Sequence, residues 1–357
     1  MSDARVTGMN VVVVSRRSSR GRWVVASLVL VGVAAGLISV NHRQVKGGDH
    51  STPDAGSVQM PLQAVAAELD DLEQRVQTAV DQGRADTMRR DVEKFIARHP
   101  RFGPAYKLMG LVYLALEQLD KAYDQFRLSL KLDPAQSQVH LLAGSICVQQ
   151  DHLDDAEHHY LEAIGLEPTN IRFRIHLAQC WVQQQRLEEA RRQLMTVLRY
   201  DSSHHLAYAM LSDVYLSENK KVLAMNQIIK ALEATPLTDR DDQINYLRRK
   251  AAILRRQNKP SESLQVFEQL SELERLDPDV IAEIATSLSM QGRFQEAALL
   301  YESTLRQVPT DWRLAAGAAD WWIKAGQHDK ARLAVDRLRA INPRLPALVG
   351  LEGRLVP

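Results

Sequence analysis

The first sixty residues combine a basic stretch with an uncharged apolar run, and this pattern predicts a membrane-spanning segment. Residues 23–40 form a run of 18 without a charged side chain, close to the minimum length of a spanning helix. Five arginines precede the run, whereas Arg43 and Lys46 are the basic residues that follow it closely. Because the more basic flank stays in the cytoplasm, we expect cytoplasmic residues 1–22 and an extracytoplasmic remainder, periplasmic if the source is bacterial.

Other interpretations of this segment remain open at the level of sequence. A cleaved secretory signal would need a small-x-small cleavage site after the apolar core, but the small residues 34–36 lie inside the run. The run could also span the membrane in the reverse orientation. Ser15-Arg16-Arg17 resembles a twin-arginine start, yet Ser19 stands where a large apolar residue is expected. An uncleaved signal anchor at 23–40 is the favoured interpretation.

Residues 41–60 are polar and contain Gly, Ser and Pro, which is typical of a flexible linker. The next segment, 61–102, predicts a long helix followed by a degenerate repeat. Its apolar side chains recur at alternating spacings of 3 and 4, at Leu62, Val65, Leu69, Leu72, Val76 and Ala79. This spacing allows a homodimer seam through 62–79 or the docking of one long helix on the helices that follow.

Downstream, hydrophobic, small and proline positions repeat with a period of 34 residues. Pro134 and Pro168 are 34 apart, Ser202 stands one period later, and Pro236 follows it by another 34. Small residues such as Gly110, Gly144 and Ala178 recur in phase, as do large ones such as Tyr113 and Trp181. Seven units are predicted in 103–345, namely 103–136, 137–170, 171–204, 205–238, 244–277, 278–311 and 312–345. The phase slips before the divergent fifth unit.

The residue types in each unit indicate a pair of antiparallel helices. Small side chains let two backbones approach closely, and large side chains fill the space between successive pairs. Proline at the end of a unit stops its second helix. One pair cannot bury its apolar face alone, so the pairs must stack into a continuous core.

Size, residue type and phase together resemble the tetratricopeptide repeat family over roughly 69–345. The resemblance implies an all-α fold, a right-handed α-α superhelix or solenoid, here preceded by one N-terminal transmembrane helix. It also implies a concave groove lined by the first helix of each unit. Residues 346–357 resemble the start of another first helix, and we expect them to cap the last open face.

The family pattern assigns groove positions on the first helices, and we expect these to bind a protein or peptide ligand. Carried onto this sequence, the candidates are Lys107, Leu111, Leu114, Leu141, Val148, Gln149, Arg172, Gln179, Gln183, Asp213, Arg248, Arg255 and Arg256. The early positions are mainly apolar and the later ones mainly basic, so a peptide with apolar anchors and an acidic portion would fit. The Lys and Asn clamp of carboxylate-binding members is absent, because Leu111 and Leu142 stand where Asn is needed.

The sharpest local charge feature is a basic run at 248–250 and 255–256. It could bind an acidic partner, a lipid head group or an acidic polysaccharide. Alternatively, it is a solvated helix face balanced by nearby acids, namely Asp239, Asp241, Asp242, Glu262 and Glu268.

Composition narrows the function. Lys+Arg 45 against Asp+Glu 44 leaves a net charge of +1, which gives no global electrostatic case for nucleic acid. The two cysteines, Cys147 and Cys180, cannot form a four-thiolate zinc site, and Cys147 fits a packing position. Asp154 and His158 are one helical turn apart, but no coherent set of three or four ligands follows, so no metal or cofactor is expected. No phosphate loop, dinucleotide fingerprint, nucleophile elbow or HExxH motif occurs, and we expect no enzyme activity.

These patterns together predict a membrane-tethered scaffold that mediates protein–protein interactions in an extracytoplasmic envelope assembly. The alternative is a chaperone-like holder of newly translocated polypeptides. A scaffold would retain one or two stoichiometric partners, whereas a holder would bind many unfolded chains weakly.

Overall fold

The computed structural model describes residues 62–273 and 278–355. Within these ranges it contains seventeen α-helices, one 3-10 helix and no strand, which confirms the all-α prediction. None of these helices is both long and apolar enough to cross a bilayer. The predicted spanning segment 23–40, the basic residues before it and the linker 41–60 lie outside the described residues.

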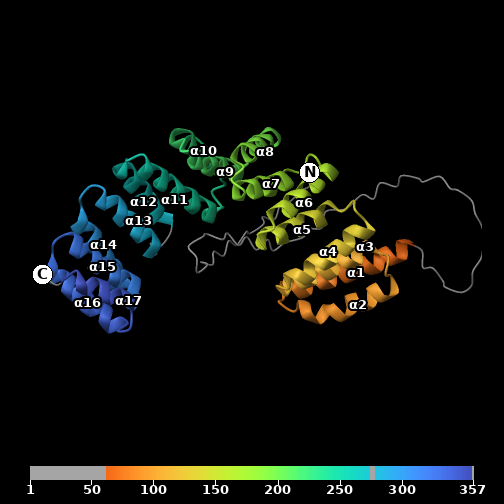
Figure 1. The fold of residues 1–357 in the computed structure, drawn as a ribbon, viewed down its shortest axis with the longest axis horizontal. Coiled ribbons are helices and arrows are strands. Elements are labelled where there is room, and N and C mark those ends of the chain that lie inside the picture. The colour runs from red at the N-terminus through yellow and green to blue at the C-terminus, as the bar shows by residue number, and fades with distance from the viewer. Residues whose placement is uncertain (1–61, 274–277, 356–357) are drawn as a thin grey trace, which may run out of the picture. The chain divides into compact units, whose positions relative to one another are not determined.

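The chain divides into two compact units, and the boundary lies between Asp155 and Ala156, within α6 (Leu153–Leu166). The helices that lie in the first unit follow one another along the chain (Figure 1). They are α1 (Leu62–Asp81), η1 (Ala85–Met88), α2 (Arg89–Arg98), α3 (Gly103–Ala115), α4 (Leu119–Leu132) and α5 (Ser137–Gln149).

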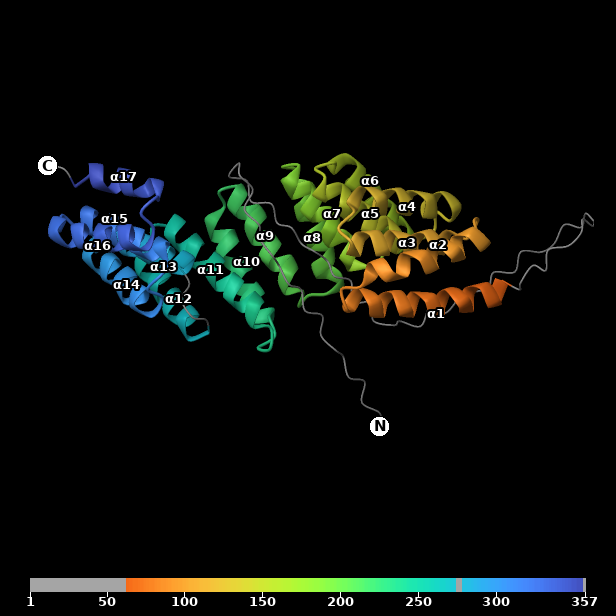
Figure 2. The same cartoon turned by 90° about the horizontal axis from the view of Figure 1, so that it is seen from below.

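The apolar stripe of α1 is buried in the core of the first unit. Its buried side chains pack in one cluster with Val92 and Phe95 of α2 and with Leu108 and Val112 of α3; they are Val65, Leu69, Leu72, Val76 and Ala79. These side chains are therefore unavailable for the homodimer seam that was one prediction for 62–79. The structure has the other arrangement, in which one long helix docks on the helices after it (Figure 2).

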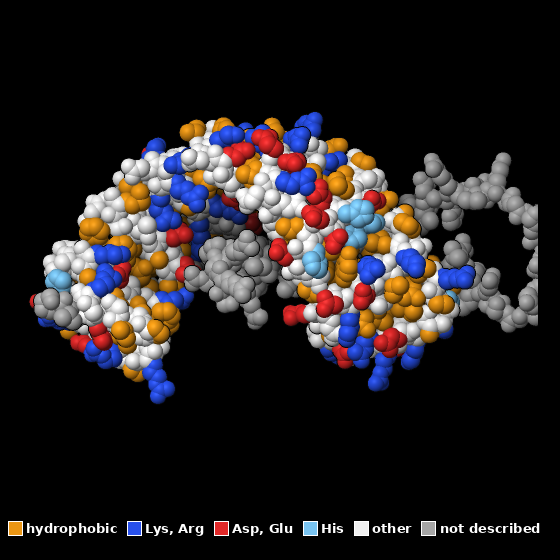
Figure 3. All heavy atoms as spheres, viewed as in Figure 1, with side chains coloured by type: hydrophobic (Ala, Val, Ile, Leu, Met, Phe, Trp, Pro, Cys, Tyr) orange, Lys and Arg blue, Asp and Glu red, His pale blue; other side chains and the backbone are white. Residues whose placement is uncertain are grey.

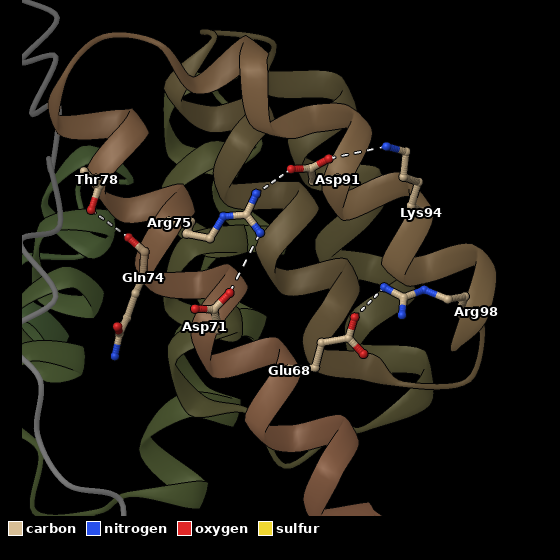
Figure 4. Close-up of polar contacts among 8 residues, drawn as sticks. All are labelled: Glu68, Asp71, Gln74, Arg75, Thr78, Asp91, Lys94 and Arg98. Atoms are coloured by element: carbon tan, nitrogen blue, oxygen red, sulfur yellow. Dashed lines mark hydrogen bonds and ion pairs between the residues drawn. The ribbon is translucent and has the colours of Figure 1, made fainter. Parts of the chain in front are cut away.

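Charged side chains join α1 to α2 on the outside of that core, as Figure 4 shows. Arg75 lies 2.6 Å from Asp91, and Arg98 pairs with Glu68. Asp91 also lies 3.6 Å from Lys94. These side chains are largely exposed, so each pair contributes about 1 kcal/mol or less, and the apolar cluster beneath them holds the two helices together.

The second unit continues the same succession of helices to the C-terminus (Figure 1). After α6 come α7 (Ile171–Gln183), α8 (Leu187–Tyr200), α9 (His205–Ser217), α10 (Lys221–Ala234), α11 (Arg240–Arg256), α12 (Pro260–Leu273), α13 (Pro278–Ser289), α14 (Phe294–Gln307), α15 (Trp312–Lys324), α16 (His328–Ile341) and α17 (Pro346–Gly353). The last helix packs against α15 and α16 and buries Leu348 and Leu351. In each pair we call the first helix A (α1, α3 and onward by odd number to α15) and the second helix B.

A left-handed residue marks the turn between the A and B helices of every pair. The residues with positive φ are Gly83, Glu117, Asp151, Gln185, Asn219, Asn258, Gly292 and Gly326. In each turn the next N–H bonds back to a carbonyl near the helix end, for example Arg186 N to Trp181 O at 2.8 Å, as in a Schellman cap. The segment 61–102, whose turn is at Gly83, is therefore a helix pair of the same kind.

The phase slip of the fifth unit corresponds to five inserted residues. Successive turn residues are 34 apart, except that Asn219 and Asn258 are 39 apart. One extra residue lies before the helix, because α9 and α11 begin 35 apart at His205 and Arg240. Four more lie within it, because α11 has 17 residues where α9 has 13. Counted from its turn, α11 is one helical turn longer at its N-terminal end, at residues 240–243.

Small residues sit where an A helix touches a B helix, as the repeat pattern predicts. A Cβ on Gly110 would overlap the Phe126 ring, and one on Gly317 would overlap the Tyr301 ring. At Ser212, which stands in the phase of Gly110, the hydroxyl donates to the carbonyl of Ala224 at 2.9 Å. Cys147 and Cys180 are both buried thiols that are not joined in a disulfide, and Cys147 occupies the predicted packing position, where its thiol is hydrogen-bonded with Tyr123.

Candidate functional site

The A helices carry the predicted groove residues, and the first compact unit, which ends at Asp155, holds six of them. Leu141 of α5 is 3% exposed, so it belongs to the core. Leu111 and Leu114 are half-buried and pack against the α3–α5 core cluster. Lys107 pairs with Glu73 of α1 at 3.0 Å. The remaining two are Val148, which is half-buried, and Gln149, which is exposed. The apolar positions of this unit thus serve its own packing more than they offer free anchors.

The second unit holds the other seven predicted residues. Arg172, Gln179 and Gln183 lie on α7, where Arg172 and Gln183 are exposed. The other four, Asp213, Arg248, Arg255 and Arg256, lie on α9 and α11. Among these four, Asp213 pairs with Arg249 and Arg255 pairs with Glu283, neither of which was a predicted groove residue.

The basic run on α11 consists of Arg248, Arg249, Lys250, Arg255 and Arg256, and we call it the α11 basic cluster. Figure 3 shows Lys and Arg side chains gathered where Figure 1 draws α11. Arg255 and Arg256 lie in the last turn of α11, and cations are favoured near a helix C-terminus. Asp241 and Asp242 occupy the first turn of the same helix, where negative charge is favoured.

Two acidic residues on neighbouring A helices pair with the α11 basic cluster. Arg249 Nη1 lies 2.6 Å from Asp213 Oδ2 on α9, and Arg255 lies 3.7 Å from Glu283 on α13. Lys250 and Arg256 form no salt bridge with any residue in the described ranges. The α11 basic cluster therefore keeps a surplus of positive charge.

Asp213 responds to this environment. Removal of its carboxylate from solvent raises its pKa, while the charges of Arg249 and Arg256 lower it. The side chain keeps 47% of its surface exposed, so water still reaches it. Asp213 of α9 therefore lies among positive charges of α11.

Titratable groups that could bind a metal converge elsewhere, at the start of α9 and α11. One ligand atom each from His205, Asp239 and Asp242 lies within 4.8 Å of the others. The repeat pattern did not identify this set, because the insertion before and within α11 moves Asp239 and Asp242 out of phase with His205. The pair Asp154 and His158 gathers no third ligand among the described residues.

Comparison with known proteins identifies the repeats. Tetratricopeptide repeat models match residues 104–136, 148–214 and 288–355; none of them describes a catalytic family. No curated protein matches this chain.

Among solved structures, a tetratricopeptide repeat protein from Parabacteroides merdae has a TM-score of 0.50 at 17% identity, covering 71% of this chain and 99% of that one. MamA matches with a TM-score of 0.42 at 17% identity, over 44% of this chain and 92% of its own. YrrB, described as having an unusual peptide-binding site, matches with a TM-score of 0.41 at 20% identity, over 54% and 97%. The matched segments have the sequence pattern of tetratricopeptide repeats, and the described residues have the all-helical fold of such repeats.

Proposed function

We propose that this chain is a membrane-tethered scaffold whose repeats bind protein partners of an extracytoplasmic envelope assembly. The observation that carries the binding part is the α11 basic cluster, where Lys250 and Arg256 have no salt-bridge partner among the described residues. A partner segment with acidic side chains would supply the missing charges. Tetratricopeptide repeats are scaffolds on which such segments bind without any chemical step.

The structure favours a selective scaffold over a general holder of unfolded chains. A holder needs exposed apolar surface along its groove. In the first unit, Leu141 is buried and both Leu111 and Leu114 contact the core. The unpaired charge on α11 instead favours a partner that is recognised by its acidic residues.

In-cell crosslinking of the full-length protein, followed by mass spectrometry, tests the binding proposal. We expect one or two envelope proteins to dominate. Reversing two cluster charges, Lys250→Glu with Arg256→Glu, should weaken their capture by about ten-fold or more, because like charges across an interface cost several kcal/mol. Arg192→Glu with Arg337→Glu is the matched control, since both arginines are exposed on B helices. A long, diffuse set of secreted chains would contradict the scaffold and support the holder.

Membrane tethering is proposed from the uncharged run 23–40 and the arginines before it. The full-length protein should stay in the membrane pellet after alkaline carbonate washing and should be released by detergent. Protease added outside the cytoplasmic membrane should digest the repeats. Release by carbonate would contradict the anchor, and protection of the repeats from external protease would contradict the orientation.

A further inference from the structure

The junction between α9 and α11 holds a group of side chains that the interaction function does not use. His205 is the first residue of α9, Asp239 directly precedes α11, and Asp242 lies in the first turn of α11. We propose that His205, Asp239 and Asp242 form a binding site for one divalent transition-metal ion of the zinc type, which ties the extra turn of α11 to α9.

The distances in this group suit a metal ion. Nδ1 of His205 lies 3.3 Å from Oδ2 of Asp242, and the three ligand atoms all lie within 4.8 Å of one another. Zinc binds imidazole nitrogen and carboxylate oxygen at about 2.0–2.2 Å, so two ligands of a tetrahedral zinc ion are separated by about 3.3 Å. The ligand atoms of His205 and Asp242 already have this separation, and Asp239 requires a small side-chain movement to complete the set.

Charge in the group favours a cation. Asp239 and Asp242 place two carboxylates beside His205, with one ligand atom of each residue within 4.8 Å of the others. The guanidinium of Arg249 on the same helix lies 2.6 Å from Asp213, so its charge is paired with that carboxylate. Two carboxylates that repel each other would gain from a shared divalent ion, and the mixed nitrogen and oxygen set favours a transition metal over magnesium.

Tyr246 supplies the outer support that metal ligands usually have. Its ring is 1% exposed, and its hydroxyl lies 3.0 Å from Nδ1 of His205 and is hydrogen-bonded to Asp242. Tyr246 thus orients Asp242, whereas its contact with Nδ1 of His205 belongs to the metal-free site, because the lone pair of that nitrogen would bind the ion.

The site depends on the inserted residues of the fifth unit. The extra turn at residues 240–243 holds Asp242, and Asp239 directly precedes it. The A helices of the other units begin with Gly103, Ser137, Ile171, Pro278 or Trp312, so His205 is the single imidazole at such a start in the described pairs. Three protein ligands leave one coordination position for water or for a partner's side chain.

Calorimetric titration of the chelator-treated full-length protein with ZnCl2 tests the proposal. We expect one zinc ion per chain, and His205→Gln or Asp242→Asn should weaken binding by about ten-fold or more. The matched controls are His158→Gln and Asp241→Asn, because both residues are exposed and Asp241 shares the same helical turn. The controls should bind within about two-fold of the wild type.

Circular dichroism of each variant verifies that it is folded, and the melting temperature should rise with zinc in the wild type and in both controls. The failure of zinc to bind would overturn the proposal, as would equal losses in variants and controls. Equal binding of MgCl2 would show a nonselective acidic surface and would also overturn it. None of these results depends on partner binding, so the scaffold function is tested separately.

Discussion

The α9–α11 junction adds polar contacts to the kind of apolar packing that it shares with the regular helix pairs. In α3 and α4, Gly110 lies against the buried ring of Phe126 and the contact is apolar. At the junction, polar groups on α9 meet polar groups on α11, through His205 with Tyr246 and Asp213 with Arg249. The regular pairs keep a period of 34, whereas the junction absorbs five extra residues.

This difference shows how a repeat array accommodates an insertion. The added turn lies at the N-terminal end of α11, so the rest of the helix keeps its distance from the turn at Asn258. Leu247, Ala251 and Leu254 are therefore still buried. In the added turn, Asp242 makes polar contacts with His205 of α9 and with Tyr246.

Removing a large side chain from a regular pair should have the largest effect. Phe126→Ala leaves a cavity beside Gly110, and we expect the free energy of unfolding to fall by about 3–5 kcal/mol. Urea denaturation measures this loss. Leu128→Ala is the control on the same helix, because Leu128 is 43% exposed, and it should change stability much less. Equal losses for both variants would mean that α4 is not packed as described.

A half-buried histidine makes the regular stack sensitive to acid. His176 of α7 stacks on Tyr160 of α6 at 5.7 Å between ring centroids, and burial lowers its pKa to about 4. The unfolded chain therefore binds a proton at higher pH than the native chain. The contribution of neutral His176 to the free energy of unfolding is complete above about pH 6.5 and is lost as the pH falls toward 4.

The loss should reach about 3 kcal/mol at most, since one pKa unit corresponds to about 1.4 kcal/mol. Stability of the wild type and of His176→Gln, measured by urea denaturation between pH 7 and pH 4, should therefore converge or cross as the pH falls. His158→Gln, at an exposed position, should retain the wild-type slope. A slope that is unchanged in His176→Gln would exclude His176 as its source.

Apolar periodicity predicted the helix pairs because burial depends on residue type and spacing alone. The same reasoning left the role of 62–79 undecided, since a dimer seam and a docked helix share one pattern. It also placed Leu141 in the groove, although that side chain is buried. The pairing of Arg249 with Asp213 depends on which side chains on neighbouring helices reach each other, which a single helix pattern does not contain.

The repeat pattern also did not predict the left-handed residues in the turns between helices. Five of the eight left-handed residues are not glycine, so glycine positions alone do not reveal them. Each such residue costs about 1–2 kcal/mol in backbone strain, and the Schellman-type hydrogen bonds of the turn offset this cost. The phase of the repeat, extended to Gly83, is the signal that identifies the pair formed by α1 and α2.

Removing one hydroxyl from the junction should have a smaller effect than either change in the regular stack. Tyr246→Phe keeps the buried ring but removes the hydroxyl that His205 and Asp242 share. We expect a loss of about 1–2 kcal/mol by urea denaturation, because two polar groups lose a partner in a half-buried site.

Tyr208→Phe is the matched control for the junction. Its hydroxyl donates to the carbonyl of Ser202 at 3.0 Å in an exposed position, where water can replace it, so its removal should cost less than 0.5 kcal/mol or so, within the range of surface substitutions. If Tyr246→Phe costs as little as the control, apolar packing of the ring alone joins α11 to α9. The junction would then be held by the same force as the regular pairs, and the contrast between the two regions would be only one of helix length.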